Sequence, residues 1–155
     1  MESLSDLLVR ELADLRRFCA LIEEERKVLT GAQADRLPDI ANAKASLAAQ
    51  LSRLEAQREA LLVKSGHGKG RAGVEAWLDS LPKSGTEQRH HWNELLELAN
   101  HARAGNETNG RLINLLLKQN QEALSVLVSG GGESIYGADG QPRTLASGKR
   151  SFGAV

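Results

Sequence analysis

Residues 86–129 carry the longest helical pattern of the chain and read TEQRHHWNELLELANHARAGNETNGRLINLLLKQNQEALSVLVS. Its apolar or small residues recur at alternating steps of three and four, the heptad pattern of a helix that packs along other helices. The sequence therefore predicts one long helix over residues 86–129. The positions of its heptad seam are Trp92, Leu95, Ala99, Ala102, Asn106, Asn109, Ile113, Leu116, Asn120, Ala123 and Leu127.

Three seam positions carry an amide, namely Asn106, Asn109 and Asn120, where Leu or Ile would bury more apolar surface. A buried amide costs stability unless it finds a hydrogen-bond partner, but it fixes the register of packed helices. Gly105 and Gly110 flank the first two, and glycine inside a helix costs ~1 kcal/mol relative to alanine. We interpret Asn106, Asn109 and Gly110 as a register motif, and we expect the helix to fray or bend between Gly105 and Gly110 when no partner is bound.

Two earlier helices are predicted over residues 3–30 and 35–64. Ser3 or Ser5 can cap the first, Gly31 can stop it, and Asp35 can cap the second, with Pro38 in its first turn. Leucine or isoleucine repeats every seven residues in both, so two rows of equal length face each other in an antiparallel hairpin. One row is Leu8, Leu15, Ile22 and Leu29, with Leu12, Cys19 and Arg26 between them, and the other is Ile40, Leu47, Leu54 and Leu61, with Leu37 and Leu51 between them.

The remaining segments complete the predicted organisation. Residues 65–73 read as a glycine-rich flexible loop, and residues 74–81 as a short helix whose Trp77 plugs one end of the bundle. Residues 130–155 are rich in glycine and serine and cannot bury enough apolar surface to fold alone. The predicted fold is all-α: an antiparallel helical hairpin plus a long third helix, forming a three-helix, coiled-coil-like bundle over residues 1–129, with a flexible tail over residues 130–155.

Composition excludes several classes of protein. The chain has 155 residues and a formal net charge of zero, which argues against a nucleic-acid binder. Aromatic residues make up only 3%, so the core is built from leucine and alanine, as in helix bundles. We find no run of ~20 apolar residues and no secretory signal, and we therefore expect a cytoplasmic protein without stable membrane insertion.

The motifs that could carry chemistry are weak. The Gly68-Lys69-Gly70 stretch follows a predicted helix rather than a strand, which argues against a phosphate-binding loop. His90 and His91 are adjacent, so on a helix they point about 100° apart and do not readily share a metal ion. Cys19 lies in an apolar row without a base beside it. The acidic and basic run over residues 23–27 reads as a solvated helix face. We therefore expect no enzyme, no cofactor and no metal.

Several motifs together resemble the FlgN family of bacterial flagellar type III export chaperones. These are the leucine-rich hairpin, the Asn106-x-x-Asn109-Gly110-x-Leu112-Ile113 core, the downstream Asn120 with Leu124 and Leu127, and the tail motif Tyr136-Gly137-x-x-Gly140. The resemblance implies a cytosolic, non-enzymatic chaperone that binds the C-terminal helical segments of the hook-filament junction proteins FlgK and FlgL. It also implies delivery of these proteins to the cytoplasmic domain of the export gate.

The resemblance places functional residues on the last turns of the long helix and in the tail. Tyr136 would dock to the export gate. Cargo contact would fall on Ile113, Leu116, Leu117, Asn120, Ala123, Leu124, Leu127 and Val128.

Two alternatives stay open from the residues alone. A structural coiled-coil adaptor without an export role would explain the heptads equally well. An enzyme is the weaker alternative. An exposed end of the long helix could also join two copies of the chain.

Overall fold

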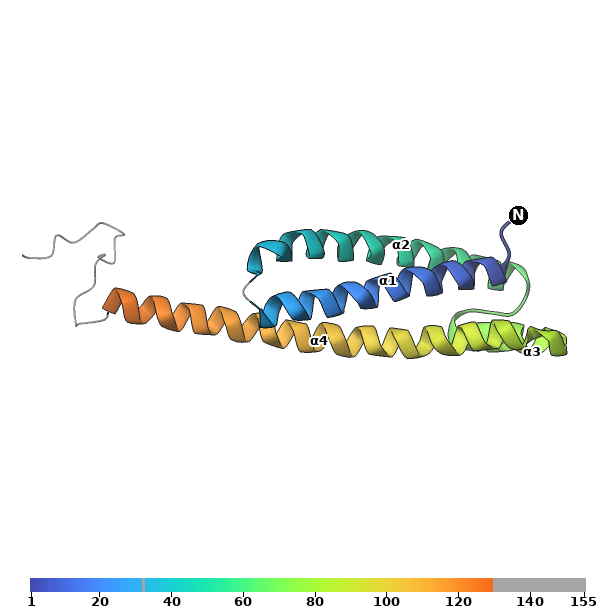
Figure 1. Ribbon diagram of the computed structural model, residues 1–155. Helices are drawn as coiled ribbons and strands as arrows, with labels where there is room; N and C mark the ends of the chain where they lie inside the picture. Colours follow the sequence, from blue (N-terminus) through green and yellow to red (C-terminus); the bar gives the residue numbers. More distant parts are fainter. Residues whose placement is uncertain (32, 130–155) are drawn as a thin grey trace, which may run out of the picture. The chain divides into compact units, whose positions relative to one another are not determined.

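The computed structural model describes residues 1–31 and 33–129, and the regular secondary structure within them is helical throughout (Figure 1). The all-helical fold predicted from the sequence is thus confirmed. The chain divides into two units, Met1–Gly110 and Arg111–Val155. The helices are α1 (Leu4–Thr30), the short 3-10 turn η1 (Ala34–Arg36), α2 (Leu37–Lys64), α3 (Gly70–Ser80), the 3-10 turn η2 (Lys83–Gly85) and α4 (Thr86–Ser129). The predicted tail, including Tyr136, lies outside the described residues.

Helix α1 begins with a capping box. The Ser3 hydroxyl accepts the amide N–H of Asp6, and the Asp6 carboxylate accepts the amide N–H of Ser3 at 3.0 Å. These two bonds satisfy amides that have no partner inside the helix. The side-chain and backbone hydrogen bonds from Ser3 also hold the pKa of Asp6 below its ordinary value, because they favour the ionised carboxylate. Gly31 caps the other end, as the sequence predicted.

Helix α2 begins differently from the prediction. Asp35 makes no capping bond, because it lies inside η1 and the capping position belongs to Arg36. Pro38 sits in the first turn of α2, where its missing N–H has no intrahelical partner in any case. The chain therefore enters α2 through a tight 3-10 turn rather than through a side-chain cap.

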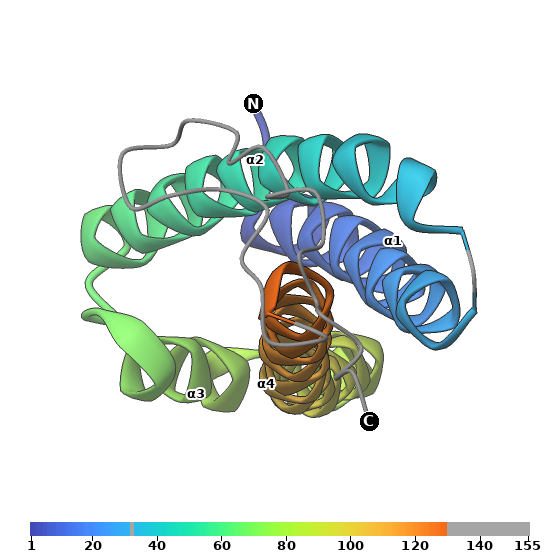
Figure 2. The ribbon, with the colours of Figure 1, turned by 90° about the vertical axis from the view of Figure 1, so that its left-hand side faces the viewer.

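The hairpin of α1 and α2 forms much of the first unit. The two helices run antiparallel and side by side (Figures 1 and 2). All four residues of the predicted α1 row are buried, as are Leu12 and Cys19 between them. On α2 only Ile40 and Leu54 of the predicted row are buried, while Leu47 and Leu61 are half-buried. Leu62 and Arg58 are buried in addition. Near the C-terminal end of α2, the buried face is therefore shifted by about one residue from the predicted row, from Leu61 to Leu62.

Helix α3 lies beside the first part of α4 (Figure 2). Trp92 of α4 is buried, and its indole N–H donates to the Glu75 carboxylate of α3 at 3.1 Å. Arg89 of α4 donates to Asp79 of α3 at 2.7 Å. Trp77 of α3 belongs to the same buried cluster as Trp92, in keeping with its predicted inward position.

Helix α3 also begins earlier than predicted, at Gly70 rather than near residue 74. Gly70 has a φ of 66°, a conformation that costs glycine little, and its amide N–H donates to the Glu59 carboxylate of α2 at 2.8 Å. Part of the predicted flexible loop is therefore the first turn of a helix that is tied to α2.

Helix α4 is continuous from Thr86 to Ser129. It includes Gly105 and Gly110, where we expected fraying or a bend. Gly105 is buried, and a Cβ built on it would lie 2.6 Å from Cγ2 of Ile22. The glycine is therefore needed for the close approach of α4 to α1. Its helix-weakening effect is offset by packing that the sequence pattern does not reveal.

Candidate functional site: the apolar end of helix α4

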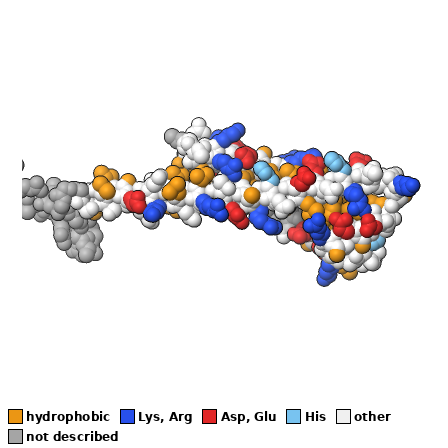
Figure 3. Space-filling view, turned by 90° about the horizontal axis from the view of Figure 1, so that it is seen from below, with side chains coloured by type: hydrophobic (Ala, Val, Ile, Leu, Met, Phe, Trp, Pro, Cys, Tyr) orange, Lys and Arg blue, Asp and Glu red, His pale blue; other side chains and the backbone are white. Residues whose placement is uncertain are grey.

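The C-terminal end of α4, residues 111–129, is apolar and exposed. We call this stretch the apolar end of α4. Its exposed large apolar side chains include Leu115, Leu124 and Leu127, which are 51%, 61% and 71% exposed. Figure 3 shows hydrophobic side chains, in orange, along this stretch on the face in view. The structure places every predicted cargo-binding residue on this exposed surface: Ile113, Leu116, Leu117, Asn120, Ala123, Leu124, Leu127 and Val128.

An exposed surface of this kind has a cost for the isolated chain. Soluble proteins rarely expose contiguous apolar patches without a binding role, because such patches promote association in water. Most helices in proteins also depend on packing of an apolar face for their stability. The apolar end of α4 is therefore a candidate docking surface.

Two exposed residues of this surface were missed by the sequence reasoning. Leu115 and Val126 are 51% and 67% exposed but lie outside the predicted seam. The signal was present in the sequence, because the apolar residues in this stretch outnumber the positions of one heptad seam. A single seam therefore describes only part of the apolar surface.

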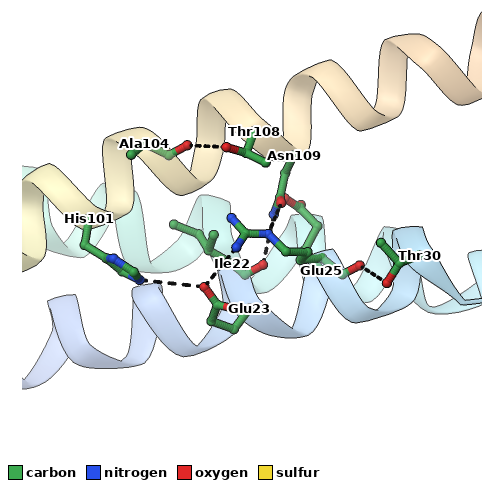
Figure 4. Close-up of polar contacts among 9 residues, drawn as sticks. Ile22, Glu23, Glu25, Thr30, His101, Ala104, Thr108 and Asn109 are labelled. Atoms are coloured by element: carbon green, nitrogen blue, oxygen red, sulfur yellow. Dashed lines mark hydrogen bonds and ion pairs between the residues drawn. The ribbon is translucent and has the colours of Figure 1, made fainter.

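Asn109, which the sequence singled out for register, is buried in the first unit and is only 1% exposed. Its side-chain N–H groups donate to the Ile22 carbonyl at 2.9 Å and to the Glu25 carboxylate at 2.8 Å. Its amide oxygen accepts from Arg26 Nε at 3.3 Å. Figure 4 shows Asn109 pointing from α4 toward Ile22 and Glu25 of α1.

The Glu25 carboxylate extends this network to α2. It accepts two hydrogen bonds from Lys44 Nζ, at 3.1 and 3.2 Å, and it is only 6% exposed. The prediction of a solvated face for residues 23–27 is thus wrong for Glu25. A buried carboxylate needs such partners, because its desolvation otherwise costs several kcal/mol.

Asn106 and Gly110 behave differently from Asn109. Asn106 is exposed, so the predicted seam is wrong at this position, and the buried residue of that turn is Gly105. The Asn106 oxygen nevertheless accepts from Lys44 Nζ at 2.8 Å. A Cβ added to Gly110 would lie in open space, with no packed atom within 4 Å, so no close packing requires glycine there. Among the three residues of the predicted register motif, Asn109 is the one whose side chain is buried and makes buried hydrogen bonds.

A second charged pair is buried between α1 and α2. Arg58 Nε donates to the Glu11 carboxylate at 2.9 Å, and the two side chains are 8% and 4% exposed. The Arg58 guanidinium also lies over the Trp92 ring, 5.4 Å from its centre. Burial raises the pKa of Glu11, and the positive charge of Arg58 opposes that rise. Sequence reasoning missed this pair.

The cysteine and histidine side chains of the described residues show no arrangement typical of a catalytic or metal site. The Cys19 thiol is buried against the Leu98 carbonyl, 3.6 Å from its oxygen, and burial raises the pKa of the thiol, which keeps it protonated and unreactive. His101 lies 3.6 Å from Glu23 on the surface. Across residues 1–31 and 33–129, no cluster of three His, Cys, Asp or Glu side chains could hold a metal ion. Within the same residues, no helix is both long and apolar enough to span a bilayer.

Comparison with known proteins agrees with the fold and with the sequence motifs. The profile of the FlgN protein family matches residues 1–144. The flagella synthesis protein FlgN of Yersinia enterocolitica serotype O:8 / biotype 1B is 42% identical to the chain over 52 residues, which are 34% of this chain and 35% of that protein. The chain therefore matches about a third of the length of that relative.

A solved structure matches more of the chain. It comes from Pseudomonas aeruginosa and carries a provisional designation as a flagella synthesis protein FlgN. It is 26% identical, with a TM-score of 0.65, and the match covers 74% of this chain and 91% of that one. The names of both relatives refer to flagella synthesis and to no enzymatic reaction. Since the family profile spans most of the sequence and the helical fold is shared, the chain belongs to the FlgN protein family.

Proposed function

We propose that this protein is a cytoplasmic export chaperone for flagellar assembly. It binds the C-terminal helical segments of the hook-filament junction proteins FlgK and FlgL, prevents their premature assembly, and delivers them to the export gate. The observation that carries the proposal is the apolar end of α4, whose large side chains are exposed in the free chain. Membership in a family with members named for flagella synthesis supports the flagellar context.

The chemistry of this surface suits a helical cargo. An amphipathic helix can lay its apolar face against the leucines of α4, in the way that helices bind apolar grooves. Asn120 lies among them as a polar position that favours one register. Because the surface is a single helix face rather than an enclosed pocket, the cargo can leave it again, as export requires.

The buried network around Asn109 supports the same role from within the first unit. Its bonds to Ile22 and Glu25 fix the register of α4 on α1 and α2. Asn109 is followed directly by Gly110, the last residue of that unit. We propose that the network fixes the part of α4 that belongs to the first unit, directly before the apolar end begins. We also propose that Tyr136 of the tail docks to the cytoplasmic domain of the export gate.

Titration calorimetry of the full chain with the C-terminal segment of FlgK tests the proposal. The variant replaces Leu116 and Leu127 with aspartate, and the matched control replaces Asn114 and Ser125, polar residues of the same stretch, with glutamine. Burying one leucine contributes about 1.5–3 kcal/mol, and 1.4 kcal/mol is a factor of ten in affinity. The leucine variant is therefore expected to weaken binding at least ~10-fold, while the control binds like the wild type.

Two other results would redirect the assignment. If the leucine variant binds as tightly as the wild type, the cargo site lies elsewhere, for instance on the hairpin of α1 and α2. If the folded wild type binds neither FlgK nor FlgL, a coiled-coil adaptor without an export role becomes the better explanation.

A further inference from the structure

The apolar end of α4 carries more apolar surface than one neighbouring helix can cover. Successive residues of an α-helix point roughly 100° apart, so each side chain of residues 111–129 can be placed around the helix axis. With Leu116 as the reference direction, the apolar side chains fill a continuous arc of roughly 220°, and only two polar residues, Gln119 and Asn120, fall inside it. The apolar residues of this arc are Leu112, Ile113, Leu115, Leu116, Leu117, Ala123, Leu124, Val126, Leu127 and Val128.

The arc resolves into two heptad seams that lie side by side. Both follow the four-three-four-three spacing that packs helices together, and they are offset by one residue. Each seam has one amide at its middle position, Gln119 in the first and Asn120 in the second, where a polar group selects the register of a partner helix. The first seam is Leu112, Leu116, Gln119, Ala123 and Val126, and the second is Ile113, Leu117, Asn120, Leu124 and Leu127.

Exposure is not confined to the middle of the arc. At its first edge, Leu115 and Val126 are 51% and 67% exposed. At its second edge, Leu117 and Val128 are 54% and 38% exposed, against 37% for Leu116 at the centre. One packed helix covers a stripe of roughly 100°. A single partner helix would therefore leave at least one of the two edges in water.

We infer that the partner supplies two helical segments, one for each seam, and that both come from one cargo molecule. This inference rests on the proposed function and specifies the form of its cargo. Two segments of one chain bind at less entropic cost than two separate molecules, because the first contact raises the effective concentration of the second. The cargo then sandwiches the apolar end of α4 between two of its own helices.

A second copy of this chain does not meet the same requirement. In a symmetric dimer each α4 receives one α4 of the other copy, because the same patch faces itself across the two-fold axis. That arrangement covers one stripe and leaves the other exposed. The width of the apolar arc thus favours a cargo with two helices over self-association.

Two edge variants of the full chain test the inference, with the C-terminal segment of FlgK as the ligand in titration calorimetry. One replaces Leu115 and Val126 with glutamine, and the other replaces Leu117 and Val128 with glutamine. The control replaces Asn114 and Ser125, on the polar side, in the same way. All six side chains are exposed, so circular dichroism should show unchanged helix content. We expect each edge variant to weaken binding about 10-fold or more, the control to bind normally, and the stoichiometry to be one to one.

The contrary outcomes are distinct. If either edge variant keeps its affinity while the Leu116 and Leu127 variant loses it, a single helix is bound, which overturns the inference but leaves the proposed function in place. Two cargo molecules per chain would overturn the single-molecule arrangement. Loss of self-association in the edge variants without loss of cargo affinity would assign the edges to a second copy. A chain ending at Ser129 that binds more tightly than the full chain would assign one seam to residues 130–155. Absence of wild-type binding would count against the proposed function itself.

Discussion

Replacing Asn109 with alanine should destabilise the first unit strongly, although the residue is a single amide. The substitution removes a hydrogen bond to the Ile22 carbonyl and a second one to the Glu25 carboxylate. A neutral hydrogen bond contributes about 1 kcal/mol, and one to a charged group contributes about 1.5–3 kcal/mol. The weaker contact with Arg26, at 3.3 Å, adds little. We therefore expect a loss of about 3 kcal/mol in the free energy of unfolding.

The loss of unfolding free energy in Asn109→Ala should be smaller than the loss expected when a buried charge is left without any partner. Glu25 keeps its two bonds from Lys44 in the variant, so its carboxylate is not left alone. Urea unfolding followed by far-ultraviolet circular dichroism, which reports helix content, measures the difference. Thr108→Ala is the matched control, because Thr108 is exposed and bonds only to Ala104 in its own helix. If Asn109→Ala loses less than about 0.5 kcal/mol, the network does not fix the register of α4.

Three further substitutions in the first unit have predicted effects on its stability. Gly105→Ala should lower the free energy of unfolding by about 1–2 kcal/mol in urea, because overpacking against Ile22 outweighs the gain in helix propensity. Gly110→Ala, with open space around it, should raise that free energy by up to ~1 kcal/mol, and the same sign for both variants would refute the packing argument. Arg58→Met should cost about 3–5 kcal/mol at neutral pH, because it leaves the Glu11 carboxylate buried without its partner. Without the Arg58 charge, which opposes the effect of burial, the pKa of Glu11 rises further, so the carboxyl is protonated more readily in the folded variant. The cost should therefore be smaller at pH 5 than at pH 8, and a cost independent of pH would contradict this.

The helical hairpin was predictable because its signal is local and repeated. Leu8, Leu15, Ile22 and Leu29 recur every seven residues, and each of them is buried. Ser3 and Gly31 bound α1 through short-range capping, which a sequence reveals directly. The predicted bounds of α4, residues 86–129, agree with those of the helix, although the seam predicted within it is wrong at Asn106.

The polar interior was not predictable in the same way. Glu25 and Arg58 look like surface residues in the sequence, and their burial depends on Lys44 and Glu11, which are distant in the chain. The need for glycine at position 105 likewise arises from Ile22 of another helix. Such pairings follow from how helices are turned about their axes, which a seven-residue repeat fixes only to within about one residue.

The sequence predicts an apolar, exposed end of α4, but the pattern used for it covers only part of the apolar surface. The predicted cargo residues are all exposed on the apolar end of α4. Leu115 and Val126 were missed because one seam was assumed: Val126 belongs to another seam, and Leu115 lies at the edge of the apolar arc outside both seams. A count of apolar residues around the helix axis would have found both.

Hydrogen exchange of the full chain, with and without the C-terminal segment of FlgK, would locate the cargo site on the chain. Amides of residues 111–129 belong to a helix with exposed side chains and should exchange readily in the free chain. We predict that FlgK slows exchange across this stretch and leaves the exchange rates of α1 and α2 unchanged. Slowed exchange confined to the hairpin between Leu8 and Leu61, with residues 111–129 unaffected, would contradict it.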